Sequence, residues 1–162
     1  MHKERSIPDW VFHDKRPETD REYFMNLTRV IFQAGMSWQV VASKWEYFLK
    51  AFDNFDIEVV SSYGVEDSER LRNDAGIIRN KQKIQATIEN AEVFKRVSKE
   101  HGSFRKWLDY LDKSNNYDYV VKRLISMFSR VGKSTAHIFL WSVGEPIKYD
   151  ESVHSRKASN LV

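Results

Sequence analysis

The chain turns between two helical patterns at Phe128-Ser129-Arg130-Val131-Gly132-Lys133-Ser134-Thr135-Ala136. Gly132 permits a positive φ and a close approach of the backbone to another molecule. The amides from Gly132 to Thr135 would point outward at the start of the second helix, where they can bind a phosphate oxygen. Lys133 adds positive charge, and the hydroxyls of Ser134 and Thr135 can donate hydrogen bonds. The turn therefore predicts contacts to a nucleic-acid backbone that do not read its sequence.

This turn resembles the hairpin of helix-hairpin-helix DNA-binding proteins, whose usual pattern is L-P-G-V-G-x-x-T-A. Val131-Gly132 and Thr135-Ala136 match the pattern, whereas Ser129 replaces its Pro and Arg130 its first Gly. The resemblance implies that residues 130–135 bind DNA. An ordinary corner between two helices is the alternative for this stretch taken alone.

A candidate catalytic carboxylate follows the turn. In the helix-hairpin-helix DNA glycosylases, the hairpin is followed by a Gly, a short loop and a catalytic Asp. Here Gly144 is followed by Asp150, so the resemblance implies that Asp150 is catalytic, with Glu151 as the competing carboxylate. Such a group stabilises the positive charge that builds on the sugar when an N-glycosidic bond breaks, and it can orient water. The alternative is that Asp150 caps the last helix. His154 and Arg156 are expected to contact DNA.

Helices with short connections are expected along the chain, because only three Pro and six Gly interrupt it and strand-like alternation is rare. Thr19 and Glu22 form a capping box at the start of the first clear helix. Asp67 is predicted to cap a later helix. A long helix is expected over residues 79–101.

Two motifs in the first half resemble those of the 3-methyladenine DNA glycosylase I family. The first, similar to the family signature Q-A-G-L-S-W, is Phe32-Gln33-Ala34-Gly35-Met36-Ser37-Trp38. The second is Asp74-Ala75-Gly76-Ile77-Ile78-Arg79-Asn80. Shorter matches keep the family order at Pro17-Glu18-Thr19-Asp20, Ala51-Phe52, Phe55-Asp56, Lys83-Ile84, Ala86, Asn90-Ala91 and Gly102-Ser103-Phe104.

The resemblance implies an all-α, helix-hairpin-helix DNA glycosylase-like helical bundle. We expect one domain over residues 1–162, with a lobe boundary near residues 113–116 and the active site between two small lobes. The implied activity is hydrolysis of the N-glycosidic bond of an alkylated, 3-methyladenine-like purine after base flipping. No Lys matches the position used for Schiff-base chemistry, so a monofunctional enzyme is expected; Lys148, close to Asp150, leaves lyase activity as a lesser alternative.

The family resemblance also implies a base pocket. The Trp that matches Trp38 lines this pocket in the family, and an indole offers a flat wall on which a flipped base can stack. An alkylated adenine is cationic, so stacking adds a cation–π contribution of about 0.5–2 kcal/mol. Phe12, Gln33 and Ser37 are the other expected base contacts. The alternatives are a core position for Trp38 and local capping by Gln33 and Ser37.

Three departures from the family pattern affect this prediction. Val30 stands where the family has a Glu that contacts the flipped base, and Val cannot accept a hydrogen bond. Phe12 replaces the usual Tyr and lacks its hydroxyl. Family members often bind a structural zinc through two Cys and two His, but this chain has no Cys, and His13 has no partners at the family positions. We therefore expect no metal site and no cofactor.

The charge distribution agrees with a nucleic-acid partner. Residues 121–162 carry seven Lys or Arg and three acidic residues, a net charge of +4, whereas the first 120 residues carry −1. An excess of positive charge at one end is expected where phosphates bind. The expected partner is double-stranded DNA that contains damaged bases, bound by a monomer.

The absence of Cys excludes disulfides and thiolate chemistry. No apolar run approaches the roughly 20 residues of a membrane span, and no signal peptide is evident, so a cytoplasmic (intracellular) protein is expected. Two other functions stay open. One is a non-catalytic or repurposed DNA-binding member of the same fold, which Val30 would favour. The other is a helical interaction protein with no nucleic-acid role.

Overall fold

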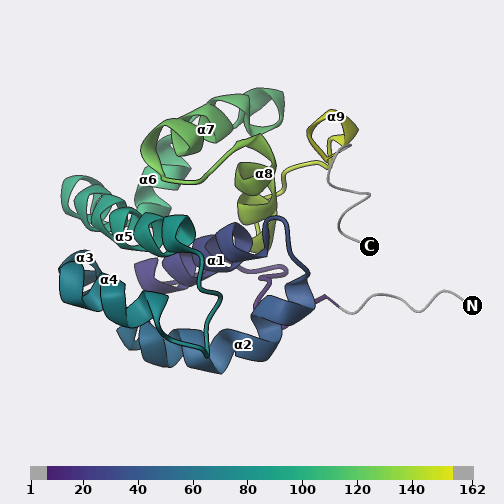
Figure 1. The fold of residues 1–162 in the computed structure, drawn as a ribbon. Helices are drawn as coiled ribbons and strands as arrows, with labels where there is room; N and C mark the ends of the chain where they lie inside the picture. The colour runs from purple at the N-terminus through teal and green to yellow at the C-terminus, as the bar shows by residue number, and fades with distance from the viewer. Residues whose placement is uncertain (1–6, 155–162) are drawn as a thin grey trace, which may run out of the picture.

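The chain forms helices and no strand over residues 7–154, the part that this computed structural model describes. Figure 1 shows their arrangement. The all-helical prediction is confirmed. In chain order the elements are α1 (Asp20–Gln33), α2 (Trp38–Ala51), the 3-10 turn η1 (Asp53–Phe55), α3 (Ile57–Ser61), α4 (Val65–Arg72), α5 (Lys81–His101), α6 (Phe104–Tyr110), α7 (Ser114–Met127), α8 (Lys133–Ser142) and α9 (Glu151–His154).

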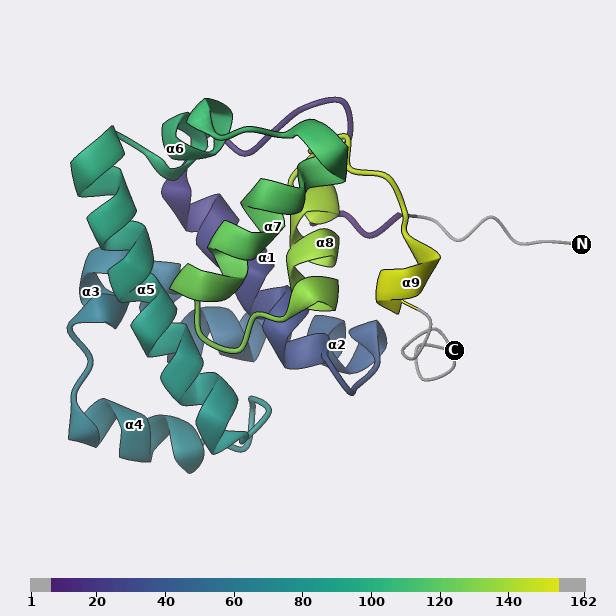
Figure 2. The same ribbon diagram turned by 90° about the horizontal axis from the view of Figure 1, so that it is seen from above.

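The long helix α5 is the element against which α1, α3, α4 and α6 pack (Figure 2). It agrees with the helix predicted over residues 79–101, and the side chain of Asn80 caps it by accepting from the Lys83 amide at 3.0 Å. Apolar side chains at helical spacing form its inner face. All of them are buried: Ile84, Ile88, Ala91, Phe94 and Val97.

Aromatic rings join α8 to the first half of the chain. The ring of Phe104 in α6 lies 4.8 Å from Tyr23 of α1, centroid to centroid. The same ring lies 4.9 Å from Phe94 of α5 and 6.0 Å from Phe139 of α8. Each such pair adds about 0.5–1.5 kcal/mol beyond the burial of its area. The cluster therefore holds α8, which follows the predicted hairpin, against α1 and α5.

The starts of α1 and α4 test two cap predictions. The Thr19 hydroxyl accepts from the Glu22 amide at 3.3 Å, and the Glu22 carboxylate accepts from the Thr19 amide at 3.2 Å, which is the predicted capping box. Asp67, in contrast, does not occupy the cap position predicted for it. The helix begins at Val65 after Gly64, and the Asp67 carboxylate reaches back to accept from the Gly64 amide at 3.1 Å. Gly has no side chain that could cap, so the acidic residue three positions later does so.

The polar stretch at 113–116 leads into α7 through a left-handed turn. Asn115, Asn116 and Tyr117 have φ values of 54°, 51° and 67°, a conformation that Asn tolerates better than most residues. The Asn116 side chain also forms paired hydrogen bonds with the backbone of Lys148, donating at 3.0 Å and accepting at 2.7 Å. This turn therefore positions the segment that leads to α9.

The segment before α1 is fixed against the end of α8. The Asn26 side chain donates to the carbonyls of Trp10 at 3.2 Å and Ser142 at 3.1 Å. The Ser142 carbonyl also accepts from the Phe12 amide at 2.9 Å. Gly144 has a φ of +82°, and a Cβ there would lie 2.3 Å from the Lys15 carbonyl oxygen, so only glycine fits this approach.

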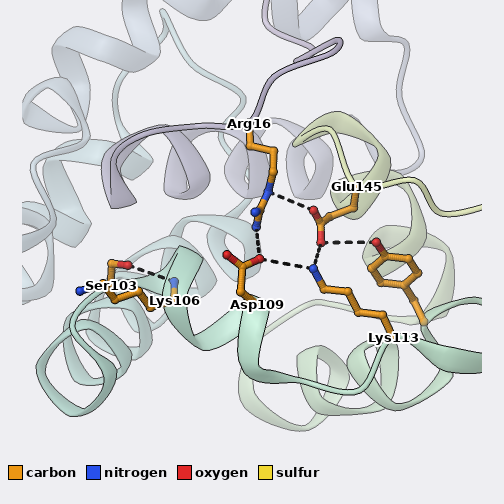
Figure 3. Close-up of polar contacts among 7 residues, drawn as sticks. Arg16, Ser103, Lys106, Asp109, Lys113 and Glu145 are labelled. Atoms are coloured by element: carbon orange, nitrogen blue, oxygen red, sulfur yellow. Dashed lines mark hydrogen bonds and ion pairs between the residues drawn. The ribbon is translucent and has the colours of Figure 1, made fainter.

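Four charged side chains reinforce this junction (Figure 3). Arg16 lies 2.7 Å from Asp109 and 3.1 Å from Glu145, and Lys113 lies 2.6 Å from Glu145 and 3.4 Å from Asp109. The Glu145 side chain is only 2% exposed, and the Tyr117 hydroxyl donates to it at 3.4 Å. Burial alone would raise the pKa of Asp109, but the contacts with Arg16 and Lys113 outweigh it and hold that pKa below its ordinary value. The network joins the N-terminal segment to α6 and to the residues after α8.

Replacing Glu145 by Ala is expected to lower the free energy of unfolding by about 3 kcal/mol, because Arg16 and Lys113 would lose their shared, buried partner. Urea denaturation followed by circular dichroism measures this change. Glu92→Ala on the exposed side of α5 is the matched control and is expected to change stability by less than about 0.5 kcal/mol. Equal effects of the two substitutions would show that the network contributes nothing to stability.

Candidate functional site

The turn between α1 and α2 is held by a buried lysine. The Lys83 ammonium of α5 donates to the carbonyls of Phe32 at 3.1 Å and Ala34 at 2.7 Å, which are among the last of α1 and have no helical partner. A cation at this end also complements the helix dipole. Gly35 follows with a φ of +81°, and the chain then enters α2. The Q-A-G part of the motif is thus a helix end that Lys83 fixes.

The end of the same motif places an indole at the start of α2. The Ser37 hydroxyl accepts from the Val40 amide at 3.3 Å and so caps the helix. Trp38 is the first residue of α2 and is half-buried. Its ring packs on that of Trp10 from the N-terminal segment, with centroids 4.9 Å apart and planes inclined by 31°.

Trp38 lines a cavity of about 260 Å³, which we call the tryptophan pocket. Its walls come from the N-terminal segment, α1 and α2, and they consist of Asp9, Trp10, Arg29, Trp38, Val41, Ala42, Trp45 and Glu46. Trp45 lies two helical turns after Trp38 on the same face of α2, a spacing that is visible in the sequence. The volume is smaller than that of most sites for drug-sized ligands and suits a single ring system.

Arg29 is the cation of this pocket. Its guanidinium carbon lies 4.1 Å from the centroid of the Trp45 ring and 5.3 Å from that of Trp10, and one N–H donates to the Asn26 side chain at 3.1 Å. Burial lowers the pKa of Arg29 to about 10, so it keeps its charge at neutral pH. Across residues 7–154 no carboxylate forms an ion pair with it. Arg29 is therefore a desolvated cation without an anionic partner.

A second hollow, of about 650 Å³, lies beside the turn between α7 and α8, and we call it the hairpin groove. Residues 130–135 form one wall, and Ile31, Ala34 and Lys83 belong to another. Arg130, Gly132 and Lys133 are exposed, whereas Val131 and Thr135 are buried and Ser134 is half-buried. The groove thus has exposed cations on the turn and runs to the end of α1.

The start of α8 leaves backbone donors for an external acceptor. Gly132 is the cap residue, and no side chain forms a cap hydrogen bond there; its φ is −98°, so the left-handed residue of the turn is Arg130 and not Gly132. The first amides of a helix have no partner within it and attract anions. The Thr135 hydroxyl lies on the buried side of α8, so the backbone and Lys133 are the exposed groups at this helix start.

Asn90 fixes the turn that precedes α8. Its side chain donates to the Ser129 carbonyl at 3.1 Å and accepts from the Ser129 amide at 2.8 Å, which satisfies both backbone groups. The next residue, Arg130, has a φ of +61°. Arg130 thus takes the left-handed conformation at the place where the hairpin pattern has its first Gly, which explains why glycine is usual there.

The other predicted base contacts lie elsewhere. Gln33 is buried, and its side-chain oxygen has no hydrogen-bond partner among the described residues. Phe12 is half-buried beside the end of α8, with the Lys15 ammonium 5.8 Å from its ring centroid. Val30 lies in the core with 0% exposure. The pocket therefore gathers Trp38 with residues that sequence reasoning did not assign to the site: Trp10, Arg29 and Trp45.

Asp150 begins the short helix α9. Its carboxylate accepts from the Ser152 hydroxyl at 2.7 Å and from the Ser152 amide at 2.9 Å. These hydrogen bonds, and more weakly the charges of Lys133 and His137, lower the pKa of Asp150. Its carboxylate is thus ionised near the start of α8, and it does not line the tryptophan pocket. Glu151 is exposed. The side chain of His154 and the whole of Arg156 lie outside the described residues.

The residues present do not fit a structural zinc. The chain has no Cys, and within residues 7–154 no three His, Asp or Glu side chains gather as metal ligands. His13 is exposed on the N-terminal segment. In the same range no helix is long and apolar enough to cross a membrane.

Arg130→Gly is expected to raise the free energy of unfolding by about 0.5–1 kcal/mol. Glycine relieves roughly 1–2 kcal/mol of left-handed strain and costs about 0.5–1 kcal/mol in chain entropy. Arg130→Ala removes the same charge without relieving the strain and serves as the control. Urea denaturation compares the two, and a glycine variant less stable than the alanine variant would contradict the strained conformation.

The sequence of this chain is similar to that of known proteins. A sequence profile of the methyladenine glycosylase family matches residues 9–138. The DNA-3-methyladenine glycosylase 1 of Escherichia coli (strain K12) is 42% identical over 88 residues, which are 52% of this chain and 47% of that protein. The DNA-3-methyladenine glycosylase of Haemophilus influenzae is 30% identical over 92 residues, 54% of this chain and 50% of that protein. The matched segments thus span about half the length of these relatives.

Solved structures extend the comparison. A crystal structure of 3-methyladenine DNA glycosylase I has a TM-score of 0.70 at 28% identity, covering 84% of this chain and 91% of that one. The Staphylococcus aureus 3-methyladenine DNA glycosylase I has a TM-score of 0.72 at 23% identity, over 83% of this chain and 80% of that one, which shows a shared fold. The family profile includes both the tryptophan pocket and residues 130–135, whereas Asp150 lies beyond it. The chain belongs to the methyladenine glycosylase family.

Proposed function

We propose that this protein is a monofunctional DNA glycosylase that hydrolyses the N-glycosidic bond of alkylated purines after base flipping. Its family membership and the names of its relatives, DNA-3-methyladenine glycosylases, support this activity. The observation that carries the proposal is the half-buried indole of Trp38, which lines a pocket that suits one ring system. Double-stranded DNA is the proposed partner, bound by a monomer.

The hairpin groove is the proposed site for the DNA backbone. The free amides at the start of α8 would bind one phosphate, and Arg130 and Lys133 would neutralise charge. These contacts fix the position of the duplex without reading its bases. A nucleotide that leaves the stack would then place its base against Trp38.

Bond cleavage requires little machinery when the base is already a good leaving group. An alkylated purine is cationic in DNA, so the N-glycosidic bond is weakened before the enzyme acts. Water adds to the sugar carbon and loses a proton to the solvent, and the cationic base takes the bonding electron pair and leaves as a neutral molecule. A carboxylate that faces the sugar stabilises its developing positive charge. Asp150 is the proposed carboxylate, because it lies near the start of α8, where the DNA backbone is proposed to bind, and its hydrogen bonds to Ser152 lower its pKa. Glu151 is the alternative.

Trp38→Ala is expected to reduce base release from methylated duplex DNA by at least about tenfold, because stacking on an aromatic ring contributes roughly 1–3 kcal/mol per base. Chromatography of the released bases under single-turnover conditions measures the rate. Trp141→Ala replaces an exposed indole on α8 that lines neither hollow, and it is expected to leave the rate unchanged. Equal rates for the wild type and Trp38→Ala would refute the role of this pocket.

Asp150→Asn is expected to slow base release by about tenfold or more while DNA binding is kept, because the neutral amide cannot stabilise positive charge on the sugar. The same single-turnover assay measures the rate, and a gel-shift titration measures binding. An unchanged rate would leave Asp150 only its hydrogen bonds to Ser152.

A non-catalytic DNA-binding member of the fold is the second candidate. The burial of Val30 in the core favours it, because this position offers no acceptor to a base. Binding to methylated DNA without release of any base by the wild-type protein would support this function and exclude the first.

A further inference from the structure

The tryptophan pocket combines flat aromatic walls with the Arg29 guanidinium, which can donate hydrogen bonds but cannot accept them. Trp10, Trp38 and Trp45 supply the rings, and Arg29 supplies the guanidinium. An Arg side chain donates through a planar fork and has no acceptor. The rings of Trp45 and Trp10 lie near the Arg29 guanidinium, and only one of its N–H groups has a hydrogen-bond partner among residues 7–154, the Asn26 side chain. Its other donors are left for a ligand.

Two carboxylates line the same pocket and narrow the class of ligand. Asp9 and Glu46 are exposed, and neither is within ion-pair distance of Arg29. Their negative charge disfavours a phosphate at this place. They can also accept hydrogen bonds from N–H groups of a neutral or cationic ligand. A ring that presents an oxygen acceptor together with N–H donors therefore matches the pocket best.

Guanine and adenine differ in the hydrogen-bond donors and acceptors along their edges. Guanine presents O6 and N7 as neighbouring acceptors, which an Arg fork binds in a bidentate manner. Its N1 and N2 groups are donors. Adenine presents an amino group beside N7, so one arm of an Arg fork would face another donor. Val30 is buried and offers no acceptor for that amino group.

We propose that Arg29 determines specificity in the tryptophan pocket and selects guanine-type alkylated bases, with a free O6 and N7, over adenine-type ones. This inference rests on the proposed function, because it takes the tryptophan pocket as the place of the flipped base. Arg29 donates to O6 and N7, the Trp38 indole stacks on the ring, and Asp9 or Glu46 accepts from the base.

The test uses the free bases, so that recognition is measured apart from bond cleavage. The full-length protein is titrated with 3-methylguanine and, separately, with 3-methyladenine, and quenching of the pocket tryptophans reports binding. The wild type is expected to bind 3-methylguanine at least about tenfold more tightly, since a bidentate Arg contact discriminates between bases by roughly 1–3 kcal/mol. Arg29→Met is expected to lose this preference, whereas Arg96→Met, on the exposed side of α5, is expected to keep it.

The Arg29→Lys variant distinguishes the effect of the planar guanidinium from the effect of its positive charge. It retains a cation near Trp45 but cannot form the bidentate contact, so it is expected to lose most of the preference while remaining folded by circular dichroism. Equal affinities of the wild type for the two bases, tighter binding of 3-methyladenine, or an unchanged preference in both Arg29 variants would overturn the inference. Release of bases from methylated DNA tests the proposed function separately. Release that favours 3-methyladenine would uphold the glycosylase and reject this role of Arg29.

Discussion

The contact between the Lys83 ammonium and the carbonyls of Phe32 and Ala34 is the interaction on which the rest of the site depends. It stops α1, and the turn that follows sets the start of α2 and the position of Trp38. Seven residues later on the same helix, Asn90 bonds both backbone groups of Ser129. Two helical turns separate these side chains, about 10 Å along the axis. One rigid helix thus fixes both the base-stacking residue and the turn beside the hairpin groove.

The N-terminal segment supplies the remaining wall of the pocket, and polar contacts from Trp10 onward hold it in place. Asn26, the ion pairs of Arg16 and the narrow space at Gly144 attach this segment to the end of α8. Trp10 is therefore positioned by polar contacts at its backbone rather than by the indole stack alone. These contacts join the N-terminal segment to the region after α8 without a metal ion. This agrees with a chain that has no Cys.

Sequence patterns predicted the helices well where local chemistry determines them. The capping box at Thr19 and the apolar face of α5 depend on residues three or four positions apart, and such spacing is visible in the sequence. The cap predicted at Asp67 lies three positions earlier, at Gly64, because a glycine can precede a helix and leave capping to the third position. The roles of Lys83 and Asn90 could not be predicted, since their partners lie 51 and 39 residues away. The motifs contain both residues, but a motif does not say which carbonyl a lysine will reach.

The pocket residues show why alignment of single positions misleads at such a site. The family resemblance matches Val30 with a base-contacting position, yet Val30 faces the core with 0% exposure, whereas its neighbour Arg29 lines the tryptophan pocket. Adjacent residues on a helix point about 100° apart, so a polar group moved by one position faces a different surface. The position that the family resemblance assigned to the base is therefore not the one that reaches the tryptophan pocket, and the hydrogen-bonding group that the pocket offers there is the Arg29 guanidinium.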